Sequence, residues 1–251
     1  MLYGLYTRRL RRQLRGLPVP RHVAIVMDGN RRWARGAGYE DVRIGHRFGA
    51  NHLEQFLLWC ADAGITCVTA WVASADNMRK RDSAEVGYLM ELTESVLAAH
   101  VRRDHRWRLH VAGRLDLLPD TTARALKEAA ELSRDRTAGD LTLAIGYSGR
   151  LEVLDAVRSV LDDAAAAGRS LDDVADTLSE QDISSNLYVP GLPDPDLVIR
   201  TSGELRMSDF LLWQTTGSDI EFCDLYWPAF REVDLLRALR TYGHRRLERS
   251  R

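Results

Sequence analysis

Cysteine and long apolar runs are scarce in this sequence. It has only three cysteines, Cys60, Cys67 and Cys223, which are odd in number and show no paired CxxC spacing. A disulfide-stapled fold is therefore excluded, and reduced thiols in a cytoplasmic protein are expected. No segment approaches the roughly 18 apolar residues that a membrane-spanning helix needs. The arginine-rich start also lacks the apolar core and cleavage site of a signal peptide.

Neither sign of charge is in excess. Thirty-five basic and 36 acidic residues give a formal net charge of -1, so no overall field attracts nucleic acid, and no nucleic-acid partner is expected. Only two of the basic residues are lysines, which leaves 33 arginines, whose planar guanidinium suits phosphate oxygens. No P-loop, GxGxxG motif or Cys/His zinc spacing is present. Any anion-binding site must therefore be local.

What the sequence does contain is a regular alternation of apolar runs with helical patterns. Its 251 residues, 45% of them hydrophobic, suffice for a full core, and no linker or repeat divides them. The unbroken runs VAIVM and LVI are typical of parallel strands covered on both faces. We predict an α/β fold, a single domain with a central, mainly parallel six-stranded sheet flanked by helices. The predicted strands are Val23–Met27, Cys67–Ala73, Leu109–Ala112, Leu141–Ile145, Leu197–Ile199 and Ile220–Cys223, and the predicted helices include Gly49–Ala63, Ala84–Arg102, Thr121–Arg134 and Leu151–Ala165.

Residues 1–20 form a separate pattern ahead of the domain, which spans 21–251. Apolar residues recur at helical spacing, with arginines between them, until Pro18 ends the pattern. This predicts a basic amphipathic helix. Docking on its own domain or on a partner subunit is favoured over a role at a membrane surface, and no stable membrane insertion is expected. The apolar positions are Tyr3, Tyr6, Leu10, Leu14 and Leu17.

The first candidate site follows the first predicted strand. That strand ends at Asp28, and Gly29, Asn30, Arg31 and Arg32 come directly after it. Ligands of open α/β sheets bind beyond the carboxyl ends of strands. A glycine allows close approach of the backbone, and the arginines add positive charge, so the segment suits a diphosphate. Asp28 could hold Mg²⁺ against the phosphate oxygens. The alternative is a plain Asp-Gly turn.

A second candidate site follows the strand Leu197–Ile199. Here a Thr-Ser-Gly turn leads from Arg200 to Arg206 and Ser208, and these side chains could clamp a second diphosphate through bidentate contacts. The alternative is that Arg200 only pairs with Glu204. Together, the two sites suggest an enzyme that holds two phosphorylated substrates side by side.

Several motifs around these sites resemble the cis-prenyltransferase family, which contains undecaprenyl diphosphate synthase and short-chain Z-farnesyl diphosphate synthases. The resemblance runs from about Arg21 to Leu239, with every motif in order. It implies that 21–251 is the catalytic domain of an Mg²⁺-dependent prenyltransferase, with a hydrophobic tunnel for the growing chain, and that the chain forms a homodimer. The motifs are MDGNRRWA (27–34), GHRFGA (45–50), SADN (74–77), GYSGR (146–150), DPDLVIRTSGELRMSDFLLWQ (194–214) and WPAF (227–230).

The resemblance also implies roles for individual residues, carried over by motif position. Asp28 would bind Mg²⁺, and the four residues after it would cradle an allylic diphosphate. Arg200, Arg206 and Ser208 would hold the diphosphate of the acceptor, isopentenyl diphosphate. Trp33 would shape the pocket wall, His46 and Asn77 would act in diphosphate handling and catalysis, and Ser74 lies in the same loop as Asn77.

The sequence departs from the family's pattern mainly near the acceptor site. Gly217-Ser218-Asp219 replaces the usual Tyr-Ser-Glu, so the implied second magnesium ligand is Asp219, and Glu221 occupies a usually aromatic position. In the catalytic loop, Lys80 stands where an arginine is usual, and Arg79 or Arg81 could compensate. Arg43 is a candidate for another family arginine.

The expected product is short. By the resemblance, the bulky Trp71 and Val72 match tunnel-facing positions of the family, so we expect a chain of about C10 to C20 with a Z double bond. Met90 and Leu97 are further tunnel candidates, although simple core packing is the favoured explanation for both. Two alternatives stay open. One is irregular, lavandulyl-type coupling of two allylic diphosphates, and the other is a non-catalytic subunit of a heteromeric synthase.

Overall fold

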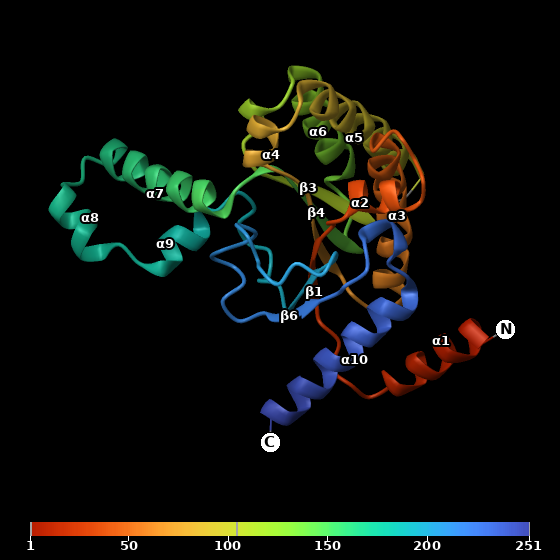
Figure 1. Cartoon of the computed structure of the whole chain (residues 1–251). Coiled ribbons are helices and arrows are strands. Elements are labelled where there is room, and N and C mark those ends of the chain that lie inside the picture. Colours follow the sequence, from red (N-terminus) through yellow and green to blue (C-terminus); the bar gives the residue numbers. More distant parts are fainter. Residues whose placement is uncertain (1, 104, 251) are drawn as a thin grey trace.

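A parallel six-stranded sheet forms the centre of the molecule (Figure 1). The computed structural model describes residues 2–103 and 105–250. The strand order is β3-β4-β2-β1-β5-β6, and every neighbouring pair is parallel. All six predicted strands are confirmed, with ends that shift by a few residues. They are β1 (His22–Val26), β2 (Cys67–Ser74), β3 (Trp107–Ala112), β4 (Gly139–Tyr147), β5 (Leu197–Arg200) and β6 (Asp219–Phe222).

The sheet separates two apolar cores. Because side chains alternate along a strand, Val23 and Ile25 of β1 enter one core, whereas Ala24 and Val26 enter the other. The larger core contains buried side chains from helices α3 (Arg43–Asp62), α5 (Ser83–Arg103), α6 (Asp120–Ser133) and α10 (Glu232–Arg249), and the smaller one is closed by Phe210 and Leu211. Coverage of both faces explains why β1 is buried along its whole length.

The helices include the five that the sequence predicts, the N-terminal one among them, and several that it does not. The predicted helix from Gly49 begins earlier, at Arg43, and the unpredicted ones are mostly too short to show a clear period. Figure 1 shows α7, α8 and α9 as an arm that projects from the sheet. The helices are α1 (Leu2–Gln13), α2 (Asn30–Gly36), α3 (Arg43–Asp62), α4 (Ala75–Lys80), α5 (Ser83–Arg103), α6 (Asp120–Ser133), α7 (Gly149–Ala166), α8 (Leu171–Thr177), α9 (Glu180–Ser185) and α10 (Glu232–Arg249), with 3₁₀ turns at Leu115–Leu117 and Trp227–Ala229.

The N-terminal helix α1 docks on α10 of the same chain. Leu10 is fully buried against Val233 and Leu236, and Arg11 forms an ion pair with Glu232 at 2.7 Å. The helix ends at Gln13, earlier than the predicted boundary at residue 20. Over the described residues, no helix is both long enough and apolar enough to cross a membrane.

Candidate functional site

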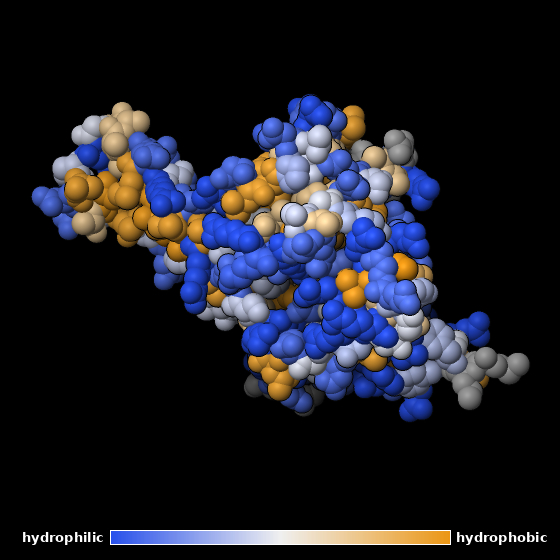
Figure 2. All heavy atoms as spheres, turned by 45° about the horizontal axis from the view of Figure 1, so that its top comes forward, coloured by the Kyte–Doolittle hydropathy of each residue, from blue (hydrophilic) through white to orange (hydrophobic). Residues whose placement is uncertain are grey.

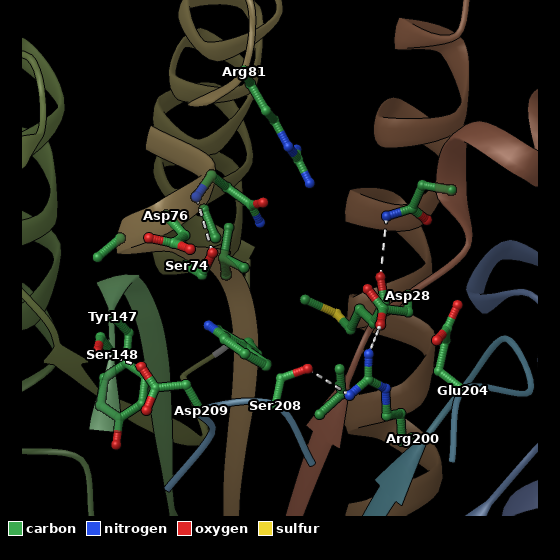
Figure 3. A pocket seen from close by; sticks show the side chains of 18 of the residues that line it. Asp28, Ser74, Asp76, Arg81, Tyr147, Ser148, Arg200, Glu204, Ser208 and Asp209 are labelled. Atoms are coloured by element: carbon green, nitrogen blue, oxygen red, sulfur yellow. Dashed lines mark hydrogen bonds and ion pairs between the residues drawn. The ribbon is translucent and has the colours of Figure 1, made fainter. Parts of the chain in front are cut away.

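A cleft of about 910 Å³ opens at the carboxyl edge of the sheet (Figure 3). Residues that follow β1, β2, β4 and β5 all reach it, because parallel strands end at one edge. Among the described lining residues, eight are arginines and four are aspartate or glutamate, so the cleft favours an anionic ligand. The arginines are Arg31, Arg32, Arg35, Arg79, Arg81, Arg150, Arg200 and Arg206.

The turn after β1 is shaped for close packing. Gly29 has a φ of 100°, and a Cβ at this position would lie 2.6 Å from the Tyr226 ring. Helix α3 approaches equally closely, since a Cβ on Gly45 would lie 2.1 Å from the carbonyl oxygen of Asn30. The turn leads directly from a parallel strand into α2, so the alternative of a plain hairpin turn is wrong.

Arg200 joins the two predicted sites. Its side chain is only 4% exposed and donates to Asp28 at 2.7 Å and to the Ser208 hydroxyl at 2.9 Å. The expected alternative pairing with Glu204 is not formed, because Glu204 instead pairs with Arg206 at 3.1 Å. A charge this buried is stable only when it is paired, so Asp28 and Arg200 act as one unit.

The segment after β5 has a strained backbone. Ser202 and Ser208 have positive φ values of 82° and 56°, which residues with a Cβ rarely adopt. Arg32 from α2 donates to the Ser202 hydroxyl at 2.8 Å and so fastens this segment to the first site. Strain that the surrounding contacts maintain is typical of ligand-binding loops.

The loop after β2 brings Ser74 and Asn77 to the cleft. The Ser74 hydroxyl accepts a hydrogen bond from the backbone N–H of Asn77 at 3.0 Å and caps α4. Lys80, in contrast, is 73% exposed, pairs with Asp76 and does not line the cleft. Arg79 and Arg81 both line the cleft, so these two arginines, and not Lys80, place cations in this wall.

His46 lies in the cleft wall beside a carboxylate that the sequence analysis did not identify. It is 7% exposed, and its Nε2 atom lies 3.1 Å from Oε1 of Glu85. Burial lowers the pKa of His46, and the hydrogen bond to Glu85 offsets only part of that effect, so the imidazole is neutral at pH 7. No motif marked Glu85, because it is one acidic residue in the first turn of an ordinary helix, α5.

Besides Lys80, three predicted residues do not line the cleft. Trp33 packs against Phe48 with ring centroids 4.9 Å apart, on the outer side of α2. Arg43 pairs with Asp41 at 2.9 Å. Asp219 begins β6, in register with Leu197 at the amino end of β5, and pairs with Arg249 at 2.8 Å. Within one chain, Asp219 is therefore at the opposite edge of the sheet from Asp28.

The far wall of the cleft comes from residues that the sequence analysis quoted only as motifs. Tyr147 ends β4 and Ser148 follows it, and Ser148 donates a hydrogen bond to the carboxylate of Asp209 (Figure 3). Behind them, Glu152 accepts from the Tyr147 hydroxyl, from Gln214 at 3.0 Å and from the backbone of Tyr188 at 3.2 Å. The GYSGR and LLWQ motifs thus meet at one buried carboxylate.

A second, apolar cavity of about 80 Å³ adjoins the cleft between α3, α5 and the sheet. Trp71 and Val72 line both spaces, at the bulge of β2, and the Trp71 ring stacks on Phe210 at 4.9 Å. Both tunnel candidates, Met90 and Leu97, pack in the larger core, and Leu97 also lines the cavity. This geometry places Trp71 and Val72 at the entrance from the cleft to the cavity.

The donor set at Asp28 fits a magnesium ion. The Asp28 side chain is 41% exposed and lines a cleft rich in arginine. Magnesium is commonly held by one or two carboxylates together with substrate phosphates. Within the described ranges, no three His, Cys, Asp or Glu side chains gather as a ready-made metal cluster. Asp28 would supply the protein's oxygen, and the anionic substrate would supply the others.

Comparisons with known proteins agree with these features. The prenyltransferase family profile, described as "Putative undecaprenyl diphosphate synthase", matches residues 26–249. An isoprenyl transferase of Streptomyces fradiae is 55% identical over 98% of this chain and 96% of its own length. A (2Z,6E)-farnesyl diphosphate synthase of Mycobacterium tuberculosis is 44% identical over 97% of this chain and 94% of its own.

A solved structure shows the same fold. Lavandulyl diphosphate synthase from Lavandula x intermedia, in complex with dimethylallyl diphosphate, superposes with a TM-score of 0.83. It is 31% identical to this chain, and the match covers 90% of this chain and 95% of the other. The family typically depends on magnesium. The sequence motifs, the sheet and these relatives show that the chain belongs to the cis-prenyltransferase family and is an isoprenyl transferase.

Proposed function

We propose that this protein is a short-chain Z-prenyl diphosphate synthase that condenses an allylic diphosphate with isopentenyl diphosphate. The observation that carries the proposal is the cleft itself, where two sets of cationic groups from different strand ends face one space that adjoins a small apolar cavity. Two diphosphates held side by side can bring their hydrocarbon ends together. Relatives named as a short-chain Z-isoprenyl and a (2Z,6E)-farnesyl diphosphate synthase support the same assignment.

In this proposal the two halves of the cleft hold different diphosphates. Gly29, Asn30, Arg31 and Arg32 hold the allylic diphosphate, whereas Arg200, Arg206 and Ser208 hold that of the acceptor. The pair between Asp28 and Arg200 lies at the boundary between the two halves. Asn77, Ser74 and His46 border the allylic half.

The chemistry follows from the charge that develops. The allylic C–O bond breaks and leaves a carbocation and a diphosphate anion, which the surrounding guanidinium and amide groups stabilise. The acceptor double bond then forms the new C–C bond, and a proton leaves to a phosphate oxygen or to Asp28. Magnesium, when bound, neutralises part of the charge on the leaving diphosphate. The buried, paired Arg200 keeps the acceptor in place during this step.

The proposal is tested by product analysis. Purified protein with Mg²⁺ is incubated with dimethylallyl, geranyl or farnesyl diphosphate, each with and without isopentenyl diphosphate. We expect linear products of about C10 to C20 that form only when isopentenyl diphosphate is present. Branched products from allylic diphosphates alone would instead establish irregular coupling, the activity in the name of the Lavandula protein. No product from any combination would support a non-catalytic subunit.

Replacing Trp71 should lengthen the product. Trp71 lines both spaces, its ring stacks on Phe210 in the smaller core, and Trp71→Ala would widen the cleft where it meets the apolar cavity. We expect the product distribution to shift upward by at least one five-carbon unit, measured by chromatography of the dephosphorylated alcohols. Leu132→Ala is a matched control, because Leu132 is exposed on α6, away from both cavities. An unchanged distribution would reject the assignment of Trp71.

We also infer that the projecting arm contributes to the homodimer that the family resemblance implies. Leucines of α7 and α8 are exposed there, and Figure 2 shows apolar side chains gathered along the arm. Apolar surface of this extent favours association. Sedimentation at twice the chain mass of 28.4 kDa would support this inference, and a monomer would contradict it. The leucines are Leu154, Leu161 and Leu171.

A further inference from the structure

One carboxylate, that of Glu85, contacts three groups of the proposed allylic-diphosphate site. Its oxygens lie 3.1 Å from Nε2 of His46, 3.5 Å from a guanidinium nitrogen of Arg31 and 3.4 Å from one of Arg81. These partners come from α3, from α2 and from the segment after α4. Arg31, Arg81 and His46 line the cleft, whereas Glu85, at 15% exposure, lies behind them. Figure 3 shows Arg81 reaching into the open space.

The two arginines share one acidic partner, and the hydrogen bonds of Arg81 are incomplete. Arg81 is largely buried, which lowers its pKa, and its Nε atom has no hydrogen-bond partner among the described residues. Among the described residues, Glu85 is the acidic group to which both guanidiniums are paired, and His46 is neutral at pH 7. The cluster therefore keeps a net positive charge that an anion in the cleft can neutralise.

Glu85 itself is held in place by its helix. The Asp82 side chain accepts a hydrogen bond from the backbone N–H of Ala84 at 2.9 Å and fixes the start of α5. The carboxylate is thus anchored next to the site, whereas the arginine side chains are long and can turn between partners. A diphosphate that enters the cleft offers both guanidiniums a stronger acceptor than one shared carboxylate.

We propose that Glu85 is a positioning residue that competes with the allylic diphosphate for Arg31 and Arg81. Before substrate binds, Glu85 forms ion pairs with both guanidiniums. The incoming diphosphate replaces Glu85 as their partner, and the ion pairs with Glu85 form again when inorganic diphosphate leaves. This inference rests on the proposed function of the site. Its consequence is that Glu85 weakens diphosphate binding and favours release of the product.

The test is the affinity for inorganic pyrophosphate, measured by calorimetry without metal ion on the full-length protein. Glu85→Gln keeps the size and an oxygen acceptor for His46 but removes the competing charge. We expect pyrophosphate to bind about fivefold more tightly and to inhibit turnover more strongly, since a partly exposed ion pair is worth a few-fold in affinity. A residue with a merely structural role would weaken binding when replaced.

Three further variants keep the test decisive. Glu91→Gln removes the same charge from an exposed position on α5 and should leave the affinity unchanged. In an Arg81→Gln background, the effect of Glu85→Gln on pyrophosphate affinity should shrink, because one of the two guanidiniums for which Glu85 and the diphosphate compete is gone. Glu85→Asp, which keeps the charge but withdraws it by one methylene, should tighten binding to a smaller degree and serves if Glu85→Gln folds poorly.

The outcomes separate this inference from the proposed function. If the unaltered protein binds pyrophosphate and Arg31→Gln weakens that binding, the anion site stands. Equal or weaker binding by both Glu85 variants would then overturn the role of Glu85 alone. If the unaltered protein does not bind pyrophosphate at all, the proposed allylic site fails, and the inference about Glu85 fails with it.

Discussion

Asp28→Asn is expected to lower kcat by about 1000-fold, because the substitution removes the one carboxylate that ends β1 at the cleft. The amide keeps the shape of the side chain and one oxygen that can accept from Arg200. It loses the negative charge that, in the proposed mechanism, would attract a magnesium ion to the diphosphate. Steady-state kinetics over a range of Mg²⁺ concentrations would measure the loss.

The choice of asparagine separates catalysis from folding. Removal of the whole side chain would leave the buried guanidinium of Arg200 without its carboxylate partner. Breaking a buried ion pair in this way typically costs about 3–5 kcal/mol of stability. Asp76→Asn is a matched control in the same cleft, since Asp76 is mostly exposed and pairs only with Lys80. Near-normal turnover of Asp28→Asn with Mg²⁺ would refute the role of Asp28.

The sheet and the ends of its central strands were predictable from sequence. Strands that are covered on both faces need unbroken apolar runs, so β1 and β5 could be predicted from the sequence. Because parallel strands end at the same edge of a sheet, the polar residues that follow these two strands were expected to lie at one edge. Asp28 and Arg200 were identified in this way. Their direct contact was not, because strand order depends on contacts between distant segments that no local pattern encodes.

Other parts of the site depend on geometry that a motif does not contain. Asp219 starts its strand instead of ending it, and a match by position could not tell which edge it would occupy. Lys80 matched the family position, yet the turn at the end of α4 directs Arg81 to the cleft. Glu85 and Glu152 belong to no recognisable motif, and an acidic residue within a helix is usually expected to face the solvent.

Glu152→Leu is expected to destabilise the protein by about 3–5 kcal/mol, the range for breaking a buried polar network. The Glu152 side chain is 2% exposed and accepts from Tyr147, Gln214 and the backbone of Tyr188. Leucine fills the space but leaves all three donors without an acceptor. Denaturant unfolding would show the loss as a lower midpoint. Asp162→Leu, at an exposed position of the same helix, should change stability by less than about 0.5 kcal/mol.

The pH dependence of Glu152→Gln would test whether the buried carboxylate itself is involved. Burial raises the pKa of Glu152 above its ordinary 4.5, so the folded protein retains this proton to higher pH than the unfolded chain does. The stability that this group contributes is therefore complete below pH 4.5 and declines as the pH rises through the raised pKa. Glutamine does not titrate, so the stability lost in Glu152→Gln should be largest in acid and should shrink toward neutral pH. A loss independent of pH would show that Glu152 keeps the same protonation state in the folded and unfolded protein, and the network would then act through its shape and hydrogen bonds alone.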